Sequence, residues 1–177
     1  DRDFWYSLAP DLVGLISRGY TFGTRDGIFE LNDDKLGVLI CFEIAIDAIS
    51  RDLVSSGAQV ILSQTNNADF GRSDETFQQV AIAKLRAIET GRAVVNDSTV
   101  GVSAIFAPDG QVLDELPTFE PGVMVAEVPL RTSITPAMAI GGGLDLAINF
   151  AALVLIVLST GRSGRWLLGK KKAPSNG

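Results

Sequence analysis

The run Leu36-Gly37-Val38-Leu39-Ile40-Cys41-Phe42-Glu43 begins as an apolar segment and contains the one cysteine of this 177-residue chain. The apolar part predicts a β-strand, and a helical pattern starts soon after it. A nucleophile at such a strand-to-helix turn is presented at the edge of a sheet, where backbone N–H groups can receive an oxyanion. Cys41 is therefore a candidate nucleophile. The alternative is a small core residue, as most lone cysteines in apolar strands are.

The segments around this run alternate between strand and helix patterns. Gly27–Leu31 and Leu36–Cys41 are apolar runs separated by the turn-rich Asn32–Lys35, which predicts a hairpin. Ala58–Ser63 is continuously apolar, as expected of a strand covered on both faces. Further strands are predicted at Ala93–Val95, Val102–Ala107, Gln111–Leu116 and Val123–Val128, with a tight turn at Pro108-Asp109-Gly110. The pattern indicates a layered α/β domain with a mixed sheet.

Two helices are predicted between these strands. Asp47–Ser56 is followed by Gly57, the residue type favoured just past a helix end. In the second helix, apolar side chains from Phe77 to Ile88 recur at helical spacing. Ser73 is placed to cap this helix, and Gly91 is placed to end it.

Composition excludes several classes of function. Residues 1–130 carry 9 basic and 20 acidic side chains, and an acidic body argues against a nucleic-acid partner, which needs clustered Lys and Arg. The chain has no histidine, so neither Ser-His-Asp nor Cys-His catalysis can be built from it. With one cysteine and no histidine, we expect no metal site and no internal disulfide.

The C-terminal third has the composition of a membrane segment. Ala137–Leu158 contains a single charged residue, Asp145, and as a helix it reaches about 33 Å, enough for a bilayer core. Basic residues follow it without an acid, which predicts a cytoplasmic C-terminus and an outward-facing body. The predicted division is a catalytic domain at 1–130, a linker and transmembrane helix at 131–160, and a basic tail at 161–177. A buried core helix is the alternative.

Residues 37–43 resemble the nucleophile segment of the carbon–nitrogen hydrolase, or nitrilase, superfamily. Within it, the order of the later motifs and the membrane segment after them resemble the apolipoprotein N-acyltransferase family of bacteria. These motifs are Asn66–Ser73, Lys84–Arg92, Gly101–Ala104 and Pro108–Gly110. Because the chain starts at Asp1 in what reads as the middle of a domain, we expect it to be the C-terminal fragment of a longer protein.

The resemblance implies an αββα sandwich, here partial, and a Glu-Lys-Cys triad. Cys41 matches the nucleophile and Glu43 the supporting acid, with Phe42 as the aromatic residue between them. Phe70 and Gly71 lie in a loop that we expect to line the acyl entrance, although an ordinary polar connection is an equal alternative. The triad's Glu and Lys belong upstream of this fragment, so the fragment alone is expected to be inactive.

The activity that the resemblance implies is acyl transfer in lipoprotein maturation, without a cofactor. A membrane phospholipid donates a fatty acyl chain to the cysteine as a thioester, and the amino group of a diacylglyceryl-cysteine at the N-terminus of an apolipoprotein accepts it. The implied location is the bacterial inner membrane, with several spans in the full-length protein. Two alternatives stay open: a membrane-tethered nitrilase-like amidase, and a non-catalytic membrane-anchored domain.

Overall fold

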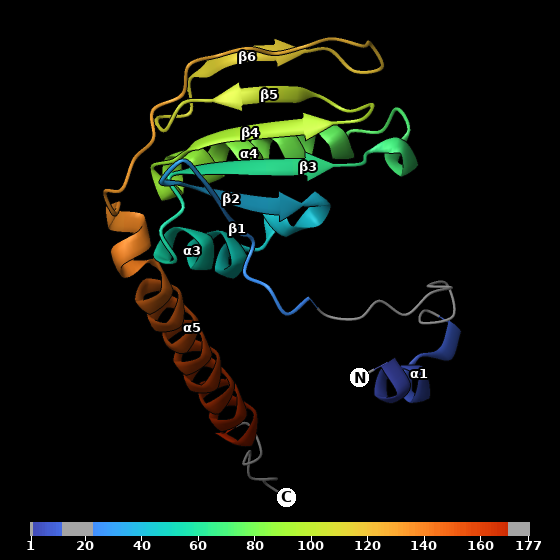
Figure 1. Ribbon diagram of the computed structural model, residues 1–177. Coiled ribbons are helices and arrows are strands. Elements are labelled where there is room, and N and C mark those ends of the chain that lie inside the picture. The colour runs from blue at the N-terminus through green and yellow to red at the C-terminus, as the bar shows by residue number, and fades with distance from the viewer. Residues whose placement is uncertain (1, 12–22, 170–177) are drawn as a thin grey trace, which may run out of the picture.

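The computed structural model describes residues 2–11 and 23–169. They include a six-stranded sheet, the helices beside it and a long C-terminal helix (Figure 1). The predicted basic tail lies partly outside these residues. The elements in chain order are α1 (Arg2–Leu8), β1 (Ile28–Leu31), β2 (Asp34–Ile40), η1 (Cys41–Ala45), α3 (Asp47–Ser55), β3 (Val60–Thr65), η2 (Ala68–Phe70), α4 (Glu75–Thr90), β4 (Ala93–Ser98), β5 (Ser103–Phe106), β6 (Val112–Leu116) and α5 (Pro136–Gly169).

The sheet is mixed, as the sequence predicts. Its strands lie in chain order from β1 to β6, with β2, β3 and β4 parallel to one another and the remaining pairs antiparallel. The predicted hairpin is confirmed at β1 and β2, where Asn32 and Asp33 both have positive φ. Two consecutive residues with positive φ form the tight two-residue turn whose twist matches that of the flanking strands.

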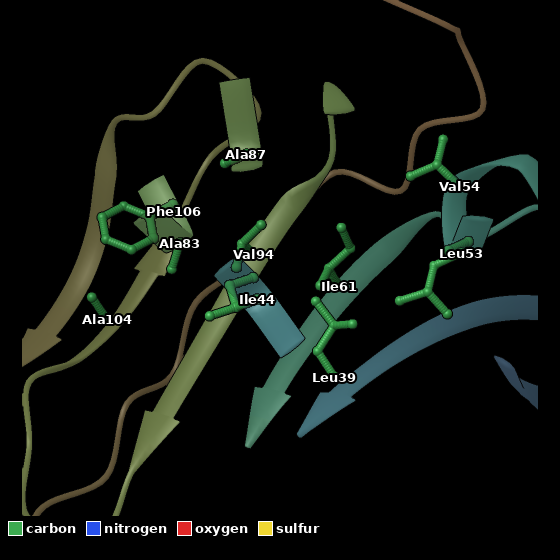
Figure 2. Packing of buried hydrophobic residues seen from close by; sticks show 11 residues of the cluster. Leu39, Ile44, Leu53, Val54, Ile61, Ala83, Ala87, Val94, Ala104 and Phe106 are labelled. Atoms are coloured by element: carbon green, nitrogen blue, oxygen red, sulfur yellow. The ribbon is translucent and has the colours of Figure 1, made fainter. Parts of the chain in front are cut away.

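Helices α3 and α4 pack on one face of the sheet, where the core lies (Figure 2). The sheet contributes alternate side chains to this face, because successive strand residues point to opposite sides. Ala83 and Ala87 let α4 lie close to the strands, and α3 adds Leu53 and Val54. The fold is thus α/β, with one sheet and one helical layer in the described residues.

Helix α4 is confirmed, but it does not bury its large apolar side chains. Phe77, Leu85 and Ile88 are about half exposed, although Val80 packs against the core. The buried side consists of small and polar residues, namely Thr76, Gln79, Ala83, Arg86, Ala87 and Thr90. The helix ends at Gly91 with the left-handed backbone expected there. The predicted cap is shifted, since Asp74 takes the N-cap position while the Ser73 hydroxyl accepts a hydrogen bond from the N–H of Glu75.

The strand predicted at Val123–Val128 is wrong. Residues 117–135 form no strand, and Val123 and Val125 are 84% exposed. Next to β6, the N–H of Val125 donates to the Asp114 carboxylate and not to a strand backbone. The apolar alternation here is therefore that of an extended segment that stays outside the sheet.

A buried arginine fastens this extended segment to the domain. The guanidinium of Arg92, 1% exposed, donates to the backbone oxygens of Ala58 at 2.7 Å and Ser133 at 2.7 Å. Burial, and secondarily the positive charge of Arg131, lower the pKa of Arg92. The Thr135 hydroxyl also donates to the Glu89 backbone oxygen, so the chain is fixed just before α5 begins.

Helix α5 agrees with the predicted membrane segment. Within residues 2–11 and 23–169, it alone contains a stretch long and apolar enough to cross a bilayer, Pro136–Ser159, and this stretch is not buried inside the protein. The alternative of a buried core helix is therefore wrong. By its length and composition, α5 is a candidate membrane span.

Arg92→Leu is expected to destabilise the protein by about 1–3 kcal/mol, because it leaves buried carbonyl oxygens without a donor. Thermal unfolding measures the effect as a lower Tm. The matched control is Arg25→Leu, since Arg25 is exposed and should leave Tm nearly unchanged. Equal melting temperatures for the two variants would contradict the role given to Arg92.

Candidate active site

The candidate site lies where the three parallel strands end. Cys41 follows β2, the loop from Asn66 to Gly71 follows β3, and Thr99 to Val102 follow β4. The carboxyl ends of parallel strands meet at one edge of a sheet, which is the usual place for a site in an open α/β sheet. Hydrogen bonds join two of these loops, because the Thr99 hydroxyl donates to the Asn66 side-chain oxygen at 2.8 Å.

Cys41 opens the turn η1 with a backbone conformation that is rare for its residue type. Its φ is +53°, in the left-handed region that normally favours glycine. Such a residue costs about 1–3 kcal/mol and persists only where its surroundings hold it. The cysteine is free and partly exposed. A strained cysteine between a strand and a helix has the arrangement of a nucleophile elbow.

The carboxylate of Glu43 holds the start of this turn. It accepts a hydrogen bond from the backbone N–H of Ile40 at 2.8 Å, directly before Cys41. The structure therefore brings Glu43 to the cysteine's turn, as predicted, and shows one task for it.

An arginine that sequence reasoning missed holds the other end of the turn. Arg86 of α4 donates to the backbone oxygens of Ile44 at 2.9 Å and Ala45 at 3.2 Å. Its guanidinium also pairs with the carboxylates of Asp47 and Glu89. Arg86 is 8% exposed, and a buried charge of this kind needs several partners. The sequence feature that could have indicated this role is a single arginine at helical spacing among the small residues Ala83, Ala87 and Thr90.

Buried polar side chains hold the loop after β3 in place against α4. Asn67 is 1% exposed, and its amide nitrogen donates to the Thr76 hydroxyl of α4 at 3.0 Å. The Thr65 hydroxyl lies 3.0 Å from the Asn67 side-chain oxygen and 3.2 Å from that of Gln79. The same Thr76 oxygen accepts the N–H of Val102. One cluster therefore sets the loops after β3 and β4 together.

Phe42 and Phe70, both predicted to bind substrate, meet at one cavity. The cavity has a volume of about 290 Å³ and lies between η1, η2 and α4. Its lining residues are Phe42, Ala45, Phe70, Glu75, Gln78, Gln79 and Ile82. Gly71 is not among them. Its φ of +58° and ψ of −130° suit glycine, so its evident task is to turn the chain after η2.

A second, larger groove is lined by strand residues that point away from the core and, at its other side, by Ile49 and Leu53 of α3. It has a volume of about 850 Å³, and its floor includes Val38 and Ile40 of β2 and Leu62 of β3. Glu43 borders this groove as well. The turn η1 thus stands between the two hollows, with Phe42 facing one and Glu43 the other.

Other charged residues of the sequence have different tasks. Lys35 pairs with Glu30 in the hairpin at 3.6 Å, and both side chains are largely in solvent. Glu89 is held by Arg51 and Arg86.

A family model described as carbon–nitrogen hydrolase matches residues 9–135. The chain belongs to this family. The sheet, the helical layer and the cysteine turn described above all lie within the matched residues.

The curated relatives of this chain include several apolipoprotein N-acyltransferases. That of Mycolicibacterium smegmatis is 33% identical over 92% of this chain and 27% of the relative. Apolipoprotein N-acyltransferase 1 of Treponema pallidum is 36% identical over 82% of this chain and 26% of the relative. The apolipoprotein N-acyltransferase of Shewanella oneidensis is 39% identical over 69% of this chain and 23% of the relative. The chain therefore spans about a quarter of the length of these relatives.

Solved structures with the same fold include an amidase from Nesterenkonia sp. AN1. A mutant of it, with an acetamide moiety covalently added at its active-site cysteine, matches with a TM-score of 0.56 at 23% identity, over 74% of this chain and 50% of the amidase. Another crystal structure of an amidase from Nesterenkonia sp. gives a TM-score of 0.54 at 24% identity, over 66% of this chain and 46% of the amidase. At these identities the likeness concerns the fold.

Arg86→Met is expected to destabilise the protein by about 2–4 kcal/mol, since it removes the donor to two backbone oxygens and one partner of two carboxylates. It should also loosen η1, which faster hydrogen exchange of the backbone at residues 41–46 would report. Lys84→Met on the same helix is the control. Unchanged exchange at the turn in the Arg86 variant would contradict the clamp.

Gly101→Ala is expected to disturb the loops after β3 and β4, because a Cβ there would lie 2.2 Å from the Thr76 hydroxyl oxygen and 2.4 Å from the Asn67 amide nitrogen. Overpacking of this kind costs about 1–3 kcal/mol. A Tm measurement tests it, with Gly23→Ala as the control, since a Cβ at Gly23 meets nothing within 4 Å. Equal melting temperatures would contradict the close packing.

Proposed function

We propose that this chain is the C-terminal part of an apolipoprotein N-acyltransferase whose nucleophile is Cys41. The observation that carries the proposal is the combination of two features in one chain. Cys41 opens a strained turn at the carboxyl edge of a carbon–nitrogen hydrolase sheet, and the same domain continues into an apolar helix. The identities with curated N-acyltransferases support the same conclusion.

The proposed reaction has two acyl transfers. The Cys41 thiolate attacks an ester carbonyl of a phospholipid, the ester C–O bond breaks, and the departing alkoxide takes up a proton to leave a lysophospholipid. The amino group of the diacylglyceryl-cysteine then attacks the thioester. Its C–S bond breaks, an amide forms, the nitrogen loses a proton, and the thiolate is regenerated. Splitting the transfer in this way is the ordinary advantage of nucleophilic catalysis.

Each predicted site residue has a proposed place in this reaction. Glu43, which already fixes the backbone before Cys41, supports the site as the acidic residue next to the nucleophile. Phe42 and Phe70 present an apolar wall to the acyl chain through the cavity that they share. Gly71 shapes the loop that carries Phe70. The triad's Glu and Lys come from sequence upstream, in a second sheet that packs over the groove floored by Val38 and Ile40.

The proposed location is the bacterial inner membrane, where both lipid substrates reside. Residues 1–130 form part of the catalytic domain on the outer face, 131–160 contain the linker and the span, and 161–177 form a cytoplasmic tail. The basic residues after α5 support this direction by the positive-inside rule. Holding the cysteine at the membrane raises its effective concentration toward membrane-bound substrates.

The test is Cys41→Ala in the full-length protein, which should abolish N-acylation of a diacylglyceryl peptide while the protein stays folded and inserted. With wild type and phospholipid alone, an acyl-enzyme should accumulate that neutral hydroxylamine cleaves. Ser98→Ala, at the end of β4, is a control that keeps Cys41.

Two results would contradict the proposal. Hydrolysis of soluble amides by the wild type, with the lipoprotein terminus left unmodified, would favour the tethered amidase. If neither the wild type nor the Cys41→Ala variant transferred an acyl group, and the variant kept the function of the protein in cells, a non-catalytic anchored domain would be favoured.

A further inference from the structure

The start of α5 carries an ion pair with the catalytic domain. Arg51 of α3 donates twice to one carboxylate oxygen of Glu89, at 3.1 and 3.2 Å. Its guanidinium nitrogen also lies 3.6 Å from a carboxylate oxygen of Asp145 on α5. Asp145 is the single charged residue between Arg131 and Arg162, so the one charge in the apolar segment is the one paired with the domain.

The same side of α5 is shaped to receive this guanidinium. Gly141 and Asp145 are four residues apart, so they lie on one face of the helix. A Cβ at Gly141 would lie 2.8 Å from one terminal guanidinium nitrogen of Arg51, and a Cβ at Gly142 would lie 3.5 Å from the other. The glycines, which weaken a helix in isolation, therefore leave the space that Arg51 occupies.

We propose that α5 enters the lipid only after Asp145, and that Pro136–Asp145 is a water-exposed stalk docked on the catalytic domain. This inference rests on the proposed membrane anchoring and adds the position of the membrane boundary. The lipid-embedded part then begins at Leu146.

The remaining length of α5 is sufficient for this assignment. Sixteen uncharged residues, Leu146–Gly161, follow Asp145, and as a helix they reach about 24 Å. This is somewhat less than the bilayer core of about 30 Å, a mismatch that long basic side chains accommodate by snorkelling. The sequence supplies Arg162 and Arg165 at that end.

A deeper position of α5 conflicts with the charges of α3. If lipid began at Pro136, Asp145 would lie well inside the hydrocarbon together with its partner Arg51. The exposed carboxylates of Asp47 and Asp52 on the same helix would then approach lipid, which is unfavourable for charged groups. Placing the boundary after Asp145 keeps all of these groups in water.

Single cysteines along α5 test the boundary. The full-length protein, with Cys41→Ser and any other cysteine replaced, is placed in nanodiscs of phosphatidylethanolamine and phosphatidylglycerol and treated with a charged maleimide. Ala139→Cys and Gly143→Cys should react, while Asn149→Cys and Ala152→Cys should react roughly tenfold more slowly, because a thiolate does not form in hydrocarbon. All four should react equally after denaturation in detergent.

The other two patterns separate the boundary from the anchoring. Protection at all four positions would overturn the boundary and leave the membrane span in place. Rapid reaction at all four would overturn both the boundary and the proposed anchoring. Membrane anchoring is scored independently by the resistance of the protein to alkaline carbonate extraction.

The ion pair itself is tested by adding a neutral substitution to the Gly143→Cys variant and measuring the maleimide labelling of that cysteine. Asp145→Asn and Arg51→Gln should each let the helix sink, and labelling there should fall by roughly fivefold. The double variant should fall no further. Glu120→Gln, which neutralises an exposed carboxylate outside α3 and α5, is the control and should leave labelling unchanged. Because the Asp145 side chain is exposed, the Asp145→Asn substitution should preserve the fold. If this variant were labelled at the same rate as the protein with Asp145 intact, the role of the pair would be overturned.

Discussion

The cysteine turn depends on the grip of Arg86 on the backbone oxygens of Ile44 and Ala45. A left-handed cysteine costs about 1–3 kcal/mol, and a hydrogen bond from a charged donor contributes about 1.5–3 kcal/mol. With Glu43 accepting the N–H of Ile40 at the other end, the restraints are large enough to hold Cys41 in its strained conformation. Cys41 is therefore positioned by backbone contacts from both sides.

The same arginine connects the site with the rest of the molecule. Arg86 pairs with Glu89, Glu89 with Arg51, and Arg51 with Asp145. A row of alternating charges thus runs from the cysteine turn, across α4 and α3, to the long apolar helix. Arg86, Glu89 and Arg51 are each held by two partners of opposite sign, which is how partly buried charges are stabilised. The orientation of the domain relative to α5 is set by this row and by the chain that Arg92 fastens.

Much of the fold could be predicted from the sequence because local chemistry determined it. Asn32 and Asp33 tolerate the positive φ that a two-residue hairpin needs, and Gly91 accepts the left-handed end of α4. The buried side of α4 could not be predicted, because it is polar. The Gln79 side-chain oxygen and the Arg86 guanidinium have hydrogen-bond partners distant in sequence, which periodicity does not reveal. The alternation at Val123–Val128 predicted a strand, but pairing with a neighbour is a tertiary property.

The candidate site shows the same limit more sharply. The turn with Cys41, Phe42 and Glu43 could be predicted, because a turn directly after a strand is a local feature. The loop with Phe70 could be placed near it, because that loop follows the next strand. Arg86 could not, since its task becomes visible only when α4 lies against η1. Everything that strains and restrains Cys41 comes from residues 40–89, so this half of the site is preorganised before any partner group arrives. In the proposed enzyme, a Glu and a Lys from another segment would need only to approach a fixed cysteine, which is the condition under which proximity lowers a barrier most effectively.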